Sequence, residues 1–128
     1  MAKVSKDTAT DVMAVEGYEG HSQDLGGYTV AYETFSSDQD PAPLFVGLPD
    51  NHCQCPHWGT VVKGALTYRY TDGTSETATA GEAYYARPGH LPSFTAGTET
   101  IEFSPTDGLA ETMAVIAKNL EAMMATGA

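Results

Sequence analysis

Short apolar segments separated by turn residues constrain the fold of this chain more than any other feature. The clearest two lie at 65–70 and 75–80, on either side of the turn TDGT with Asp-Gly at its centre. Asp-Gly between two such segments is a strong signal of a two-stranded hairpin. A tyrosine-rich segment follows Gly81, and others of the same kind lie at 12–15, 27–35, 43–50, 57–62 and 98–105. The pattern predicts an all-β antiparallel sandwich or barrel, not alternating strands and helices.

The C-terminal part has a different periodicity. From Asp107 onward the apolar residues recur at spacings of four and three: Leu109, Met113, Ile116, Leu120 and Met123. This spacing predicts one amphipathic helix over 107–126, with Asp107 as its N-cap. At the other end, residues 1–12 show no periodicity and predict a loose arm, and the polar stretch 20–27 predicts a turn.

Length and charge exclude several classes of protein. With 128 residues and 41% hydrophobic content, the chain predicts a single domain, 1–128, around one core. The formal charge is −11 and the six Lys and Arg residues are scattered, so no basic surface exists for nucleic acid or for an anionic membrane. No signal-peptide pattern and no stretch of ~20 apolar residues is present, which predicts a cytoplasmic protein.

One segment concentrates the residues that carry chemistry. Asp50–Gly64, DNHCQCPHWGTVVKG, holds both cysteines and two of the four histidines. Side chains alternate along a strand, so Cys53, Cys55 and His57 would share one face and His52 would point to the other, although Pro56 interrupts a regular ladder. Two cysteines this close on one strand face are a poor disulfide pair. They are expected to be thiols or metal ligands.

Residues 44–105 resemble a cupin, a small jelly-roll barrel with the motifs G-x5-H-x-H-x3,4-E-x6-G and G-x5-P-x-G-x2-H-x3-N. With Gly64 as the last glycine of the first motif, the glutamate position falls on His57. The two histidine positions fall on one of two pairs, according to the spacing used: Asn51 with Cys53, or Asp50 with His52. Both registers stay open at this point.

The second motif keeps its glycines and loses its polar residues. Gly81 and Gly89 match. The proline, histidine and asparagine positions are occupied by Arg87, Pro92 and Ala96. His90 lies two residues before the expected ligand, on the same face of a strand, and can reach the same pocket. The resemblance therefore implies a cupin-like jelly-roll barrel with one C-terminal helix and with substituted metal ligands.

A metal site is the leading hypothesis for function. The predicted ligands are Cys53, Cys55, His57 and His90, with His52 as an alternate. Thiolate and imidazole favour one divalent transition metal, zinc first and iron or copper next, over magnesium or calcium. The alternative to a metal site is a purely structural role, with two buried thiols and two hydrogen-bonded histidines and no metal.

The resemblance to cupins also implies a small-molecule ligand at the mouth of the barrel. The predicted substrate-binding residues are Trp58, Tyr68, Tyr85 and Arg87. The activity would be of lyase, isomerase, cyclase or dioxygenase type. The rival interpretations are a non-catalytic cupin that only binds a ligand or a structural metal, and a metal-free interaction protein. A homodimer is expected, because strand edges and the apolar stripe of the helix need covering.

Overall fold

The computed structural model describes residues 2–125 and consists of two antiparallel sheets and one long helix. The first sheet has six strands in the order β1-β2-β3-β9-β4-β7. Their bounds are Asp11–Val15 (β1), Tyr18–Leu25 (β2), Tyr28–Phe35 (β3), Thr98–Pro105 (β9), His57–Lys63 (β4) and Ala83–Ala86 (β7). The second sheet has three strands in the order β6-β5-β8: Ser75–Thr79 (β6), Ala65–Tyr70 (β5) and His90–Phe94 (β8). The predicted all-β class is confirmed.

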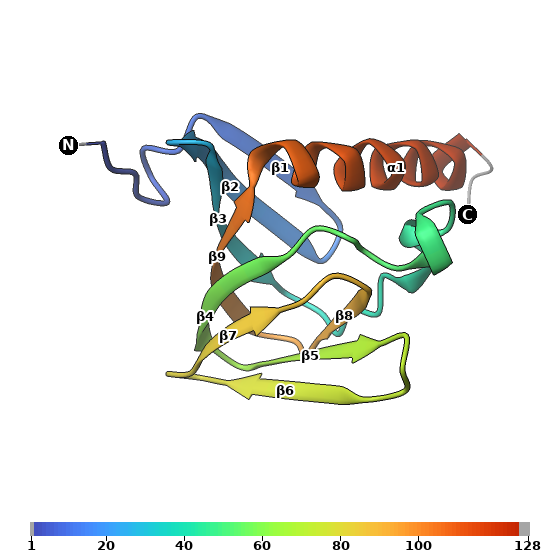
Figure 1. Ribbon diagram of the computed structural model, residues 1–128. Coiled ribbons are helices and arrows are strands. Elements are labelled where there is room, and N and C mark those ends of the chain that lie inside the picture. Colours follow the sequence, from blue (N-terminus) through green and yellow to red (C-terminus); the bar gives the residue numbers. More distant parts are fainter. Residues whose placement is uncertain (1, 126–128) are drawn as a thin grey trace.

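The helix α1, Thr106–Ala125, follows β9 directly and lies along the top of the view in Figure 1, where it contacts the 3₁₀ helix η1 (Ala42–Phe45), β9 and β3. It starts one residue before Asp107, which therefore lies in the first turn. The side-chain amide of Asn119 donates to the carbonyl oxygens of Leu44 (2.7 Å) and Val46 (2.8 Å), which ties α1 to the loop before β4. The single C-terminal helix is thus confirmed up to residue 125, and the predicted end at residue 126 lies outside the described residues.

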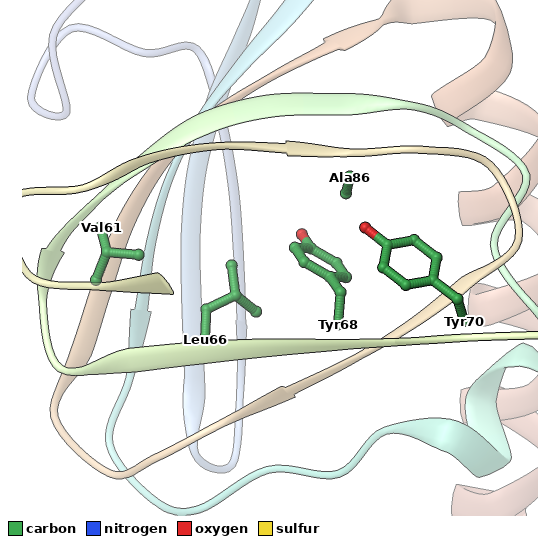
Figure 2. Close-up of a cluster of buried hydrophobic side chains, with 5 residues drawn as sticks. All are labelled: Val61, Leu66, Tyr68, Tyr70 and Ala86. Carbon is green, nitrogen blue, oxygen red and sulfur yellow. The ribbon is translucent and has the colours of Figure 1, made fainter. Parts of the chain in front are cut away.

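The core between the sheets divides into two clusters. Figure 2 shows the first, in which Leu66, Tyr68 and Tyr70 project from β5 toward Val61 on β4 and Ala86 on β7. The second consists of Phe45, Cys53 and Cys55, and its partly buried neighbours include Leu109 and Ile116 of α1. The two cysteines predicted as ligands therefore lie at the end of the sandwich that the helix covers.

Two predicted segments are wrong. The expected strand at 43–50 is replaced by two short 3₁₀ helices, η1 (Ala42–Phe45) and η2 (Pro49–Asn51). Each has proline at its start, where the fixed φ suits a helical turn and the missing N–H would weaken a strand ladder. The expected turn at 20–27 is instead mostly strand β2, which pairs with β1 on one side and β3 on the other.

The N-terminal segment lies against the six-stranded sheet. Residues 2–10 contain turns but no strand. The hydroxyl of Tyr32 donates to the carbonyl oxygen of Val4 (3.0 Å), and Lys6 Nζ donates to Thr34 Oγ1 (3.5 Å). Among residues 2–125, no helix has both the length and the apolar character that crossing a membrane requires.

Candidate metal centre and cavity

Three of the predicted ligands come together. One ligand atom from each of Cys53, His57 and His90 lies within 4.8 Å of the other two, and all three residues are buried. Cys53 Sγ is 3.6 Å from His57 Nε2, and the two imidazole rings are 4.9 Å apart between centroids. Bonds of ~2.3 Å to sulfur and ~2.0 Å to nitrogen at a tetrahedral angle put these atoms ~3.5 Å apart. The Cys53–His57 pair therefore has the separation of two ligands in a tetrahedral metal site, and a ligand atom of His90 lies within 4.8 Å of both.

Backbone pairing brings the three residues together from different segments. Cys53 lies between η2 and β4 and forms an isolated bridge with His90, the first residue of β8. The N–H of Cys53 donates to the carbonyl of His90 (2.9 Å), and the N–H of His90 donates to the carbonyl of Cys53 (3.2 Å). His57 is the first residue of β4, in the facing sheet. The site thus joins both sheets at one end of the sandwich.

Hydrogen bonds orient both imidazoles with one nitrogen free. His90 Nδ1 lies 2.6 Å from the carbonyl oxygen of Arg87 and donates to it. His57 Nδ1 lies 2.7 Å from Ser104 Oγ and 3.3 Å from Glu102 Oε1. Because a carbonyl oxygen can only accept, the proton of His90 lies on Nδ1 and leaves the Nε2 lone pair available. In His57 a proton on Nδ1, with Ser104 or Glu102 as acceptor, would have the same effect. Outer hydrogen bonds of this kind fix the tautomer of metal-binding histidines.

The electrostatic environment keeps the imidazoles neutral. Burial lowers the pKa of His57 to about 4, and burial together with His57 lowers the pKa of His90 to about 4. Burial raises the pKa of the Cys53 thiol, partly offset by the nearby hydroxyl of Thr112. Neutral imidazole is the form that binds a metal, and a bound divalent ion would stabilise the thiolate of Cys53.

The other two predicted ligands lie outside this cluster. The Cys55 thiol donates to the carbonyl oxygens of Pro56 (3.5 Å) and Pro105 (3.9 Å), and burial raises its pKa to about 12. His52 Nδ1 lies 2.6 Å from the carbonyl oxygen of Asp50. The structure therefore brings together Cys53 and His57, as in the first motif register, and leaves Asp50 and His52 of the second register apart from them.

A cavity of about 190 Å³ lies next to the three candidate ligands. Its walls are mainly apolar, and α1 closes one side with Leu109, Thr112, Met113, Ile116 and Leu120. The predicted apolar stripe of the helix thus faces this cavity through all its members except Met123. A metal at the Cys53 cluster would be open to a small ligand from the cavity side.

Two partly buried glutamates, Glu33 and Glu102, also line the cavity, and sequence reasoning missed both. Glu102 Oε2 accepts hydrogen bonds from the hydroxyls of Tyr68 (2.9 Å) and Tyr84 (2.5 Å). Glu33 Oε2 accepts one from the hydroxyl of Tyr18 (2.6 Å). Burial raises the pKa of both carboxyls, and for Glu33 the neighbouring Glu102 contributes, so that its pKa is about 8.

A glycine lies directly opposite each glutamate on the neighbouring strand. Gly59 pairs with Glu102, and a Cβ there would lie 2.6 Å from the ring of Tyr84. Gly20 pairs with Glu33, and a Cβ there would overlap the hydroxyl of Tyr18. The missing side chains let each tyrosine lie across the sheet and reach its carboxyl. The two glycines therefore position the polar groups of the cavity.

The four predicted substrate-binding residues do not share one pocket. Tyr68 lines the cavity beside the metal cluster. Trp58 and Tyr85 pack on each other at 5.1 Å on the outer face and are 41% and 50% exposed. Arg87 donates to Asp72 (3.0 Å) and lies over the ring of Tyr70. Tyr68, Tyr85 and Arg87 also line a second, more polar hollow, and Trp58 lines neither.

Comparison with known proteins rests on structure. No family model matches the sequence, and no curated protein matches it. A cupin of the RmlC-like type from Shewanella frigidimarina is 16% identical over 75% of this chain and 84% of its own, with a TM-score of 0.50. The polyketide cyclase RemF from Streptomyces resistomycificus is 15% identical over 82% and 79%, with a TM-score of 0.55. Fe(II)-HppE with the alternative substrate (S)-1-HPP is 11% identical over 81% and 60%, with a TM-score of 0.55.

Two facing antiparallel sheets with a buried Cys/His/His cluster at one end define a β-sandwich with a candidate metal site. The similar structures place this sandwich in the cupin fold, as the sequence resemblance predicted. At these identities the likeness concerns the fold alone.

Proposed function

We propose that this chain is a metal-binding cupin that acts on a small organic molecule in the cavity beside the metal. The observation that carries the proposal is the convergence of one thiol and two neutral imidazoles, with ligand atoms within 4.8 Å, at the wall of an apolar cavity. Cys53, His57 and His90 would hold the ion. The activity would be of lyase, isomerase, cyclase or dioxygenase type.

The number of ligands favours a reactive metal over a structural one. Structural zinc sites have four protein ligands, whereas catalytic sites have three and an open position. Within residues 2–125 the cluster comprises three residues, and Cys55 makes hydrogen bonds elsewhere. When bound, the ion would supply Lewis acidity or an activated water at that position. The residues of the chain would hold the two imidazoles in one tautomer and exclude bulk water.

The donor set guides the choice of metal. One thiolate and two imidazoles suit zinc first. HppE, which has the same fold, is described as an Fe(II) protein, so iron is the first alternative. Both cysteines are free thiols, which suits the cytoplasmic location expected from the sequence.

Elemental analysis of protein purified without a chelating tag tests the metal part. About one equivalent of zinc or iron per chain is expected for a three-ligand site, and less than about 0.2 equivalent overturns it. Cobalt substitution then tests access. Azide should change the visible spectrum of the cobalt protein if one position is open to the cavity. A spectrum that azide leaves unchanged at saturation would favour a closed, non-catalytic site.

A further inference from the structure

The cavity holds a second polar position, on the β3 strand, that the metal cluster does not use. Glu33 and Glu102 differ in how far their hydrogen-bonding capacity is filled. Glu102 Oε2 accepts from two tyrosines, and its Oε1 faces His57 at 3.3 Å. Glu33 Oε2 accepts from Tyr18, but Oε1 has only Thr100 Oγ1 at 3.5 Å, which is a long and weak contact. Glu33 Oε1 is therefore an acceptor at the cavity wall with capacity left for a ligand.

The charges around the cavity define what that ligand can be. Among residues 2–125, no lysine or arginine lines the cavity. Glu102 lies against His57 of the cluster, whereas no lysine or arginine of the described chain lies against Glu33 to neutralise it when it is ionised. A carboxylate or a phosphate placed at Glu33 itself would meet repulsion from the ionised carboxyl, and none of the described lysines and arginines lies in the cavity wall to receive it. A cation would be complementary to Glu33.

Aromatic rings next to Glu33 also suit a cation. Tyr18 and Phe35 pack at 5.2 Å between ring centroids, and Phe35 stacks on Phe94 at 3.6 Å, all three at the cavity wall. Ring faces attract ammonium groups, and most strongly where water is excluded. The size of the cavity limits the rest of the molecule: an apolar cavity of ~150 Å³ accepts benzene, and this one measures about 190 Å³.

From these observations we propose that the cavity binds a primary amine in its protonated form, with an apolar body about the size of one aromatic ring and the ammonium group on Glu33. That this amine is a substrate rests on the proposed function. Its binding depends only on Glu33, Tyr18 and the aromatic wall. Tyr18 is a positioning residue, because its hydroxyl fixes the carboxyl, and Gly20 leaves the space that Tyr18 needs.

Proton release gives an independent signature of this contact. In the empty cavity burial and the neighbouring Glu102 raise the pKa of Glu33 to about 8, so at neutral pH the carboxyl carries a proton. The groups that face it are Tyr18 from β2, and Thr100 and Glu102 from β9. An ammonium group at Oε1 favours the ionised carboxylate, and the proton of Glu33 leaves to solvent. The heat of binding should then vary with the ionisation enthalpy of the buffer.

The experiment compares three probes of nearly equal shape by titration calorimetry: benzylamine, benzyl alcohol and benzoate. Each is titrated into metal-loaded and metal-free protein. Benzylamine should bind most tightly and benzoate least. The preference for benzylamine should persist in metal-free protein, because it does not arise from coordination of the amine to the ion. Benzoate binding as tightly as benzylamine to metal-free protein overturns the proposal.

Variants assign the contact to Glu33. Glu33→Gln should weaken benzylamine binding by about 10- to 100-fold, the range expected for a charge-assisted hydrogen bond, and should abolish the buffer dependence. Glu99→Gln, on the outer side of β9 and paired with Lys63, is the matched control and should change neither. Tyr18→Phe, which keeps the ring, should weaken binding by a smaller factor. If Glu33→Gln binds benzylamine as the parent does, the assignment is wrong.

Metal content measured in the same samples separates this inference from the proposed function. Glu33→Gln should retain the metal of the parent protein, since Glu33 is not a ligand. Metal at about one equivalent with no preference for benzylamine would refute the amine site alone. Benzylamine binding that depends on Glu33 in a protein that takes up no metal would refute the proposed function alone.

Discussion

Cys53 and Cys55 allow a direct test of the ligand assignment. The same Cys→Ser substitution should weaken metal binding at Cys53 and leave it unchanged at Cys55. The two side chains are 1% and 2% exposed, so Cys→Ser buries one hydroxyl at either position and costs a similar free energy of unfolding, ~1–3 kcal/mol. Only Cys53 belongs to the cluster with His57 and His90. We expect Cys53→Ser to lose metal affinity and Cys55→Ser to keep it.

The size of the loss follows from the number of ligands. A zinc site with four protein ligands binds with ~10–16 kcal/mol, so one ligand accounts for roughly 3 kcal/mol. Loss of that amount weakens binding by about 100-fold. The assay is competition for zinc against a chromophoric chelator at fixed pH, with circular dichroism of each variant to establish folding. Equal losses of affinity in the two variants would show that Cys55 is also a ligand and that the three-residue site is wrong.

Four further predictions concern single residues and assembly. His57→Ala should remove more metal than His21→Ala, since His21 only pairs with a surface glutamate at 2.9 Å; equal metal content in the two variants would refute the site. Gly59→Ala should lower the free energy of unfolding by about 1–3 kcal/mol through overlap with the Tyr84 ring, measured by urea unfolding; an unchanged midpoint would contradict this. The pKa of Glu33 is raised from 4.5 to about 8, so its contribution to stability is full below pH 4.5 and is lost as pH rises through 8. As pH rises between these values, Glu33→Gln should therefore become more stable relative to the parent, measured by urea unfolding. A difference in unfolding free energy between variant and parent that does not change with pH would contradict the raised pKa of Glu33. The homodimer stays a prediction, to be tested by light scattering at micromolar concentration, where a monomer would exclude it.

Local sequence signals predicted the strands and the helix correctly where the order of apolar and polar residues matched the order of buried and exposed side chains. The hairpin around Asp72 and Gly73 and the stripe from Leu109 to Leu120 are examples, because turn chemistry and periodicity act within a few residues. The polar stretch 20–27 was predicted as a turn but is mostly strand β2. This strand is held by pairing with β1 and β3, and no signal within the stretch itself indicates that pairing.

The metal cluster could be predicted only in part. Cys53, His57 and His90 stand out by residue type, but strand parity failed for Cys55, because β4 begins at His57 and the residues before it are not in a regular strand. Glu33 and Glu102 were not predicted as cavity residues, although the sequence of β9 contains an indication of a polar interior. Its even positions, Thr98, Thr100, Glu102 and Ser104, are polar, yet they face the interior, while Phe103 on the other face is 41% exposed. Such an inverted strand marks a polar lining within an otherwise apolar core.

The position of α1 has a consequence for how the site is assembled during synthesis. All three candidate metal ligands precede α1 in the chain, and so do both sheets that hold them. On the ribosome they emerge before the helix that closes the cavity. An ion or a small molecule can therefore enter the partly folded β-sandwich before α1 has been synthesised. Once the helix has docked and Asn119 has formed its two hydrogen bonds, α1 closes one side of the cavity. Metal loading of the proposed site while the chain is being made would avoid the side that α1 closes, so metal uptake by the completed apoprotein should be slower than incorporation during translation.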